Sequence, residues 1–250
     1  MFFIILCFLI GCTNIDVRSK STDDQKLELR IERKYKTGAN NFVYLIKEIT
    51  PEMEECAIVP ELCFPVPAAT ASGIVFSSDD ASIFVLTAAH FCVDDPEEIP
   101  FAYTGRIVGI ASDVPRTLFP IKIDEKSDLC MLMGVKNKKE KFKNIKIAKK
   151  LTIGEEIYTV AAPLGIGGPG FRLIFEGLLS GCNQNQCMVT TEAAPGSSGA
   201  AILNESNEII SIVMAVPQDF SSVVLAPSNI DLWNFILELD KEVDIYPYIR

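Results

Sequence analysis

Short apolar runs separated by turn-forming residues occupy most of this chain, and they constrain its fold more than any other feature. From residue 40 onward, about a dozen runs rich in Val, Ile and Phe alternate with Gly, Pro, Asp and Asn. The clearest are FVYLIKEI, SIFVLTA, SDLCMLM, EEIYTVAA and EIISIVMAV. Only residues 229–242 differ, because their apolar residues recur at helical spacing. The pattern predicts an all-β sandwich or barrel that ends in one helix.

The distribution of charge limits the partners of such a protein. The chain has 33 acidic and 23 basic residues, for a net charge of -10 at pH 7. Because phosphate contacts need clustered Lys or Arg, we expect no nucleic-acid partner. Eight Lys residues do gather within residues 136–150, which we interpret as a solvated connector, with a patch for anionic lipid or polymer as the alternative. The polar residues 13–38 predict a tether.

The N-terminal residues predict export. Residues 2–10 form an apolar run that is too short to span a bilayer as a helix but matches the core of a signal peptide. The sequence LIGC at residues 9–12 resembles the bacterial lipobox, in which the cysteine carries lipid, so residues 1–12 predict a signal peptide and a lipidation site at Cys12. We expect a cell-envelope lipoprotein that associates with the membrane, or a secreted or periplasmic protein. The Lys or Arg that usually comes directly after the first Met of a signal peptide is missing here. A cleaved soluble form, a retained anchor and a start codon further upstream are therefore alternatives.

The cysteines fit an oxidising compartment. Of the eight cysteines, loss of Cys7 with the leader and lipidation of Cys12 leave six, which allow three disulfides in any of fifteen arrangements. Two pairs close short loops, and the remaining two cysteines form the third pair. The three expected pairs are Cys56–Cys63, Cys182–Cys187 and Cys92–Cys130. Buried free thiols in a cytosolic protein are the alternative.

Three separated residues have the chemistry of an activated serine. Ser198 lies in PGSSG at residues 195–199, and a hydroxyl is a poor nucleophile near neutral pH unless a base removes its proton. His90, the only histidine, ends the run LTAAH. Its imidazole needs a buried carboxylate that holds one tautomer, and Asp128, at the start of the apolar run DLCML, suits that role. An ordinary turn residue is the alternative interpretation of Asp128.

These residues and their surroundings resemble the trypsin-like serine proteases, and among them the catalytic domain of the bacterial HtrA (Deg) type. The matching segments occur in the family's order, with His, Asp and Ser in sequence. They are SGIV (72–75), LTAAH (86–90), SDLCML (127–132), APLG (162–165), GLLSG (177–181), TTEAAPGSSGA (190–200) and LAPSN (225–229).

The resemblance implies two packed six-stranded antiparallel β-barrels and one C-terminal α-helix. It divides the chain into a first barrel at 39–135 with His90 and Asp128, the connector at 136–150, a second barrel at 151–228 with Ser198, and a helix and tail at 229–250. The backbone N–H groups of Gly196 and Ser198 would form the oxyanion hole. The resemblance implies neither a cofactor nor a metal, and the residues that follow Ser198 leave no room for a PDZ domain.

The substrate pocket is open to two interpretations. Glu192, six residues before Ser198, would favour Lys or Arg in the substrate if it lay at the base of the pocket. Met214, Ala215 and Val216 match the strand that forms one wall, and the Val216 side chain would narrow the entrance. A small aliphatic residue before the scissile bond is then favoured, because pocket volume decides more than charge.

The sequence therefore predicts a serine endopeptidase that cleaves protein or peptide substrates through an acyl-enzyme on Ser198. The alternative is a catalytically silent protein of the same fold that binds peptides or a protein partner. The placement of the only histidine in a matching motif favours the enzyme over this alternative and over a purely structural lipoprotein. The sequence carries no signal for an oligomeric state.

Overall fold

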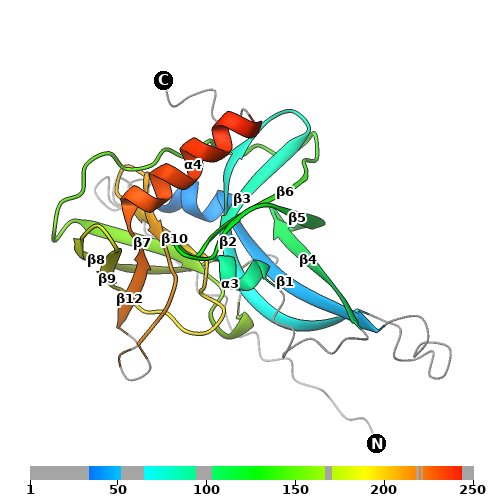
Figure 1. Cartoon of the computed structure of the whole chain (residues 1–250), viewed down its shortest axis with the longest axis horizontal. Coiled ribbons are helices and arrows are strands. Elements are labelled where there is room, and N and C mark those ends of the chain that lie inside the picture. The colour runs from blue at the N-terminus through cyan, green and yellow to red at the C-terminus, as the bar shows by residue number, and fades with distance from the viewer. Residues whose placement is uncertain are drawn as a thin grey trace, which may run out of the picture.

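The computed structural model describes residues 34–51, 65–93, 103–166, 171–217, 220 and 222–243. The predicted signal peptide, the lipidation site at Cys12 and the Cys56–Cys63 pair lie outside these residues. Within them, no helix is both long and apolar enough to cross a membrane. The described chain is mostly β, as its pattern predicts, and Figure 1 shows two sheets side by side with a C-terminal helix against them.

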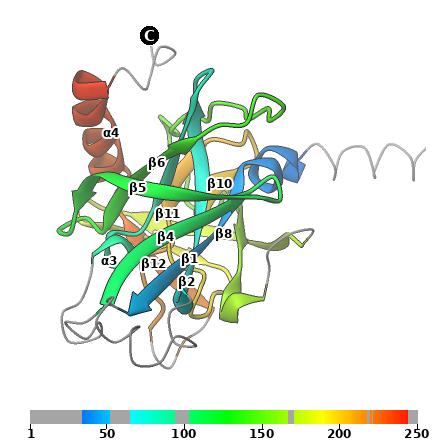
Figure 2. The ribbon, with the colours of Figure 1, turned by 90° about the vertical axis from the view of Figure 1, so that its right-hand side faces the viewer.

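The first sheet is a closed antiparallel barrel with strand order β1-β2-β3-β6-β5-β4. Figure 2 shows this barrel from the side, with the long strands β1 and β4 crossing it. Its strands are β1 (Phe42–Pro51), β2 (Val66–Ser78), β3 (Ser82–Thr87), β4 (Tyr103–Ala111), β5 (Val114–Asp124) and β6 (Leu129–Val135). A helix of one turn, α3 (Ala89–Cys92), follows β3.

The second sheet also has six antiparallel strands, in the order β11-β10-β7-β8-β9-β12. An antiparallel bridge between Ala215 and Leu225 joins its two ends. Its strands are β7 (Glu156–Ala161), β8 (Leu173–Cys182), β9 (Gln186–Thr190), β10 (Ala201–Asn204), β11 (Ile209–Ile212) and β12 (Val223–Pro227). The chain ends in α4 (Asn229–Val243), close to the predicted helix. The two six-stranded barrels and the helix that the sequence predicts are thus confirmed.

Strand β6 explains why some predicted strands are apolar without interruption. Leu129 and Met131 pack in the core between the two sheets, whereas Cys130 and Leu132 pack inside the first barrel. Side chains of a strand alternate between its two faces, so a strand that is covered on both faces needs apolar residues at every position. The core between the sheets also takes up the apolar face of α4. One continuous core therefore holds the two barrels and the helix together.

Strand β5 is absent from the apolar runs in the sequence. Its segment VPRTLFPIKID contains two prolines and four charged or polar side chains. Pro120 lies at a register shift in the pairing of β5 with β6, which is where a strand tolerates a residue that lacks an N–H donor. The segment completes the first barrel despite its composition, because its neighbours on both sides supply the pairing partners.

The predicted tether at 13–38 extends too far, because residues 34–41 form a helix. Lys34 forms ion pairs with Glu156 at 2.9 Å and with Glu176 at 3.0 Å, and the Tyr35 hydroxyl donates to Glu176. These hydrogen bonds hold the pKa of the Glu176 carboxyl below its ordinary value. The rings of Tyr35 and Tyr158 pack in a T-shaped arrangement with 5.1 Å between their centroids. This helix therefore fixes the start of the first barrel to the second.

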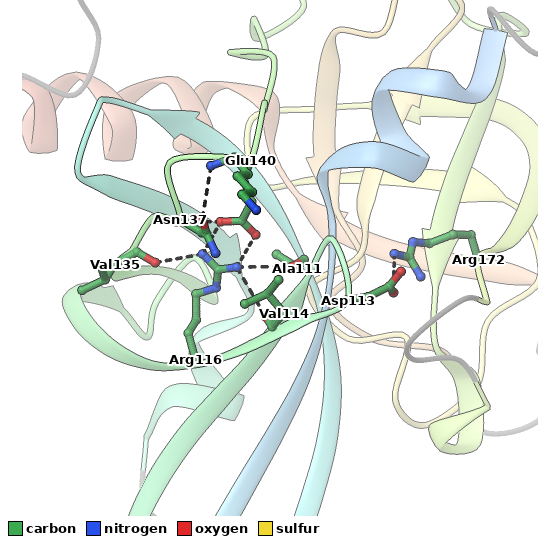
Figure 3. Close-up of polar contacts among 9 residues, drawn as sticks. Ala111, Asp113, Val114, Arg116, Val135, Asn137, Glu140 and Arg172 are labelled. Carbon is green, nitrogen blue, oxygen red and sulfur yellow. Dashed lines mark hydrogen bonds and ion pairs between the residues drawn. The ribbon is translucent and has the colours of Figure 1, made fainter.

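The Lys-rich connector at 136–150 is anchored to the first barrel, as Figure 3 shows. Glu140 and Arg116 form an ion pair in which both side chains are buried. Arg116 also donates to the carbonyl of Val135 at 2.8 Å, and Glu140 accepts the N–H of Asn137 at 2.8 Å. A buried ion pair is stable only when such additional hydrogen bonds satisfy its charges. Most Lys side chains of the connector remain exposed around this anchor.

The two barrels meet at Ser72 of β2, a fully buried residue. Its N–H donates to the carbonyl of Ser198 at 2.9 Å, and its hydroxyl donates to the carbonyl of Gly196 at 2.8 Å. The same hydroxyl accepts the N–H of Ala162, which follows β7, at 3.0 Å. One side chain of the first barrel thus holds two segments of the second.

Gly199 lies in this seam with a positive φ of 80°. A Cβ atom there would come within 2.2 Å of Thr87 Oγ1 and 2.4 Å of the Ser72 carbonyl oxygen. Real Cβ contacts are never this short, so only glycine allows the loop of Ser198 to approach the first barrel this closely. The loop and the end of β3 are therefore neighbours, although they are far apart in the sequence.

We expect Gly199→Ala to force the barrels apart and to reduce the free energy of unfolding by about 3 kcal/mol or more, since it adds a clash to backbone strain. Gly154 is the matched control, because its φ is 82° but a Cβ there would meet nothing within 4 Å. Gly154→Ala should cost only about 1 kcal/mol. Urea unfolding of both variants measures the difference, and equal losses would contradict the close contact at the seam.

Candidate active site

His90 and Asp128 form a closely bonded pair at the end of the first barrel. His90 Nδ1 lies 2.9 Å from Oδ2 and 3.0 Å from Oδ1 of Asp128. The backbone N–H of His90 also donates to Oδ1 of Asp128 at 2.9 Å. An ionised carboxylate only accepts, so this arrangement selects the tautomer with the proton on Nδ1 and leaves Nε2 as an acceptor.

Backbone geometry brings Asp128 to this position. Asp128 has a φ of 52°, in the left-handed region that Asp tolerates better than most residues. Its carbonyl accepts the N–H of Ala89 at 3.2 Å, and strand β6 pairs with β3 directly behind it. The Asp128 side chain is 13% exposed, and that of His90 is 50% exposed. The carboxylate is thus shielded, while the imidazole reaches the surface.

Ser198 comes to the same region from the second barrel. Its carbonyl is tied to Ser72, and Gly199, the next residue, contacts Thr87 and Ala88 just before α3. The described contacts therefore bring the Ser198 backbone to the segment that carries His90. They do not include a hydrogen bond from the Ser198 hydroxyl to the imidazole, a contact that is often long in enzymes without substrate.

The loop before Ser198 presents two backbone amides that have no partner among the described residues. The N–H of Ser197 donates to Ala194 at 2.9 Å, and that of Gly199 donates to Val213 at 2.8 Å. The amides of Gly196 and Ser198, in contrast, make no hydrogen bond within the described ranges. Gly196 has a φ of 94°, and a Cβ on it would lie 2.5 Å from the Ala162 carbonyl oxygen. Such a pair of amides is suited to bind an oxygen that gains negative charge.

A pocket of about 520 Å³ adjoins Ser198. Among the described residues, its walls contain Met214, Ala215 and Val216, which the sequence predicts for one wall, and no charged side chain. The lining residues are Ala193, Ala194, Pro195, Ser198, Val213, Met214, Ala215, Val216 and Pro217. Glu192 is exposed and does not line the pocket. The structure therefore brings Met214, Ala215 and Val216 to Ser198, and it leaves Glu192 outside.

Two of the three expected cysteine pairs are disulfides in the structure. Cys92–Cys130 joins the end of α3 to β6, and Cys182–Cys187 closes the hairpin of β8 and β9. Among the described residues, no cluster of His, Cys, Asp and Glu side chains has the arrangement of a metal site.

Ser72 and Thr87 are the functional positions that sequence reasoning missed. Both are short polar residues in buried strands, and Thr87 Oγ1 donates to the Ser72 carbonyl at 2.8 Å. A buried hydroxyl needs a partner, so a polar residue within an apolar run is a signal that something must meet it there. The sequence does not reveal that the partner is the loop of Ser198.

Comparison with solved structures supports the fold. The crystal structure of the serine endoprotease from Yersinia pestis superposes with a TM-score of 0.61. The superposition covers 84% of this chain and 66% of the other, at 17% sequence identity. Likeness at this identity establishes the chymotrypsin-like fold of two barrels.

Comparison with curated sequences finds serine proteases described as HtrA-like. The protein of Staphylococcus haemolyticus (strain JCSC1435) is 25% identical over 191 residues, which are 70% of this chain and 27% of the relative. That of Staphylococcus aureus (strain MRSA252) is 23% identical over 221 residues, which are 81% of this chain and 27% of the relative. This chain thus spans 27% of the length of either relative.

The family comparison covers the core of both barrels. The model of the trypsin-like peptidase domain matches residues 71–212, which is more than half of the chain and includes His90, Asp128 and Ser198. With the fold and the arrangement of these residues, this match establishes that the chain belongs to the trypsin-like peptidase family.

Proposed function

We propose that the protein is a serine endopeptidase that hydrolyses peptide bonds through Ser198, His90 and Asp128. The observation that carries this proposal is the double contact of His90 Nδ1 with the Asp128 carboxylate at 2.9 and 3.0 Å. It orients the only imidazole of the chain, and the seam at Ser72 brings the Ser198 loop to the same place. A catalytically silent binding protein of this fold has no need for a buried carboxylate that holds the imidazole of a histidine in one tautomer.

In the proposed reaction, His90 Nε2 takes the proton of the Ser198 hydroxyl as the oxygen attacks the carbonyl carbon of the substrate. Asp128 stabilises the imidazolium that forms, without itself being protonated. The imidazolium then gives its proton to the leaving amine, and the acyl group remains on Ser198. Water, activated by His90 in the same way, hydrolyses this ester and restores the enzyme.

The amides of Gly196 and Ser198 are proposed to form the oxyanion hole. Each amide is without a partner in the described part of the chain. The turn that contains them is held in place by the Ser72 hydroxyl, which donates to the carbonyl of Gly196. The developing oxyanion gains most from donors that need no rearrangement. The fixed loop therefore contributes to the rate by being in place before the substrate arrives.

The pocket beside Ser198 is proposed to bind an uncharged aliphatic side chain before the scissile bond. Its lining is apolar, with Val216 on its wall. Burial of a Lys or Arg there would leave the cation without a carboxylate partner among the described lining residues. Glu192 is exposed and lies outside this lining, so it does not supply the carboxylate that a basic preference would require.

Export to an oxidising compartment is part of the same proposal. The two disulfides among the described residues fit such a compartment. The predicted leader with Cys12 would supply the export signal and a lipid anchor. Exported proteins or peptides would then be its substrates.

The purified chain should react covalently with a fluorophosphonate probe, because a serine that is activated by His90 attacks phosphorus as it attacks a carbonyl carbon. Mass spectrometry should place the adduct on Ser198. Ser198→Ala should abolish labelling, and Ser197→Ala is the matched control that should keep it. Correctly folded wild-type protein that resists several such probes would contradict the enzyme and favour the silent binding protein.

Val216→Ala should shift the preference of the enzyme toward larger apolar residues, since it removes two methyl groups from the pocket wall. We expect the ratio of kcat/KM for Phe over Val before the scissile bond to rise roughly tenfold. Peptide libraries read by mass spectrometry measure this ratio. Glu192→Gln should leave the preference unchanged, and a loss of cleavage after Lys or Arg in that variant would show that Glu192 faces the pocket.

A further inference from the structure

The Cys92–Cys130 disulfide lies directly beside the His90–Asp128 pair. Cys92 is two residues after His90, and Cys130 is two residues after Asp128. The covalent bond therefore joins α3 to the start of β6, next to the hydrogen bonds between His90 of α3 and Asp128, which directly precedes β6. The second disulfide among the described residues lies in the hairpin of β8 and β9 and joins no residue of this pair.

Helix α3 depends on such external support. It has only four residues, and its N-cap Ala88 provides no side-chain hydrogen bond. A single turn is unstable by itself, because helix nucleation fixes several residues for few hydrogen bonds. Apart from its bonds to Asp128, its end is held by Lys47 Nζ, which donates to the carbonyl of Val93 at 2.7 Å. Ala89 and Phe91 also pack in the core of the first barrel, and the disulfide is the covalent member of these supports.

A cavity of about 160 Å³ adjoins the disulfide on the Cys92 side, since Cys92 is one of its lining residues. Lys47 and Arg106 line this cavity together with Cys92. Cys92 is 8% exposed, whereas Cys130 is fully buried. The Lys47 cation favours the approach of a thiolate, which is the attacking form of a thiol, whereas the charge of Arg106 is paired with Glu48 at 2.7 Å.

We propose that Cys92–Cys130 is a redox-sensitive brace that positions His90 against Asp128 and that a dithiol reductant opens it through this cavity. This inference rests on the proposed function, because its consequence is a change in catalytic rate. Cys92 and Cys130 are positioning residues in this scheme, since they act through His90 and touch no reacting atom.

The exchange follows ordinary thiol–disulfide chemistry. One thiolate of the dithiol attacks Cys92 Sγ, the bond between the cysteines breaks, and Cys130 Sγ leaves and takes a proton. The second thiol of the reductant attacks the mixed disulfide, and Cys92 leaves as a thiolate that is protonated in turn. Two cysteine thiols and one oxidised dithiol result, so the disulfide is reduced by the two electrons that the dithiol loses.

Opening the brace acts on kcat rather than on KM. The pocket that binds the substrate belongs to the second barrel and has no residue in α3 or β6. A small displacement of a catalytic group can lower a rate by one or two orders of magnitude. We therefore expect the reduced enzyme to lose kcat roughly tenfold with KM little changed.

The test compares the full chain before and after incubation with dithiothreitol. Alkylation in denaturant after the exchange has been quenched with acid, read by mass spectrometry, should detect free thiols at Cys92 and Cys130, and the rate of fluorophosphonate labelling and kcat should fall together. Re-oxidation should restore both. The double variant Cys92→Ala/Cys130→Ala should have the lowered kcat and labelling rate with or without dithiothreitol. The control Cys182→Ala/Cys187→Ala should keep the wild-type rates and should still slow when dithiothreitol is added.

Each outcome decides between the two proposals. An oxidised protein that never labels overturns the proposed function, and this inference with it. An oxidised protein that labels, and that keeps its rate after both thiols are shown to be free, overturns the brace alone, as does a disulfide that dithiothreitol cannot reduce in the folded protein. If the double variant fails to fold, the reduced wild-type chain, checked by near-ultraviolet circular dichroism, still gives the answer.

Discussion

The contact of Ser72 with the Ser198 loop is the interaction on which the rest of the site depends. Buried polar groups are stable only when they are bonded, and the Ser72 backbone and hydroxyl satisfy carbonyls of Gly196 and Ser198. Gly199 allows this approach because it has no side chain. The first barrel carries His90 and Asp128, and the second carries Ser198. The geometry of this proposed catalytic group therefore depends on the contacts between the barrels.

The apolar core between the barrels supports this seam. Strands β3 and β6 bury one face inside the first barrel and the other against the second sheet and α4. His90 lies in α3, just after β3, and Asp128 directly precedes β6. A shift of the core would therefore move the imidazole and the carboxylate together, whereas a shift at the seam would move Ser198 relative to both. Stability and proposed function thus share the same contacts.

The sequence predicts those features that are written in local patterns. SDLCMLM is recognisable as a strand because both its faces are buried, and the spacing of the cysteines indicates Cys182–Cys187. Strand β5 is not recognisable, because its prolines and charges are tolerated only through pairing on both sides. The helix at 34–41 depends on Glu176, 142 residues away from Lys34. Likewise, the position of Glu192 follows from the course of a loop, which no local pattern specifies.

The central claim is that Ser198, His90 and two backbone amides meet across the seam, and a crystal structure of the phosphonylated protein tests it most directly. The account predicts phosphorus on Ser198 Oγ, with one phosphoryl oxygen about 2.7–3.1 Å from the amide nitrogens of Gly196 and Ser198. His90 should keep its contact with Asp128 and lie within hydrogen-bond reach of Ser198 Oγ. An adduct on another residue, or a phosphoryl oxygen that faces solvent, would contradict the account.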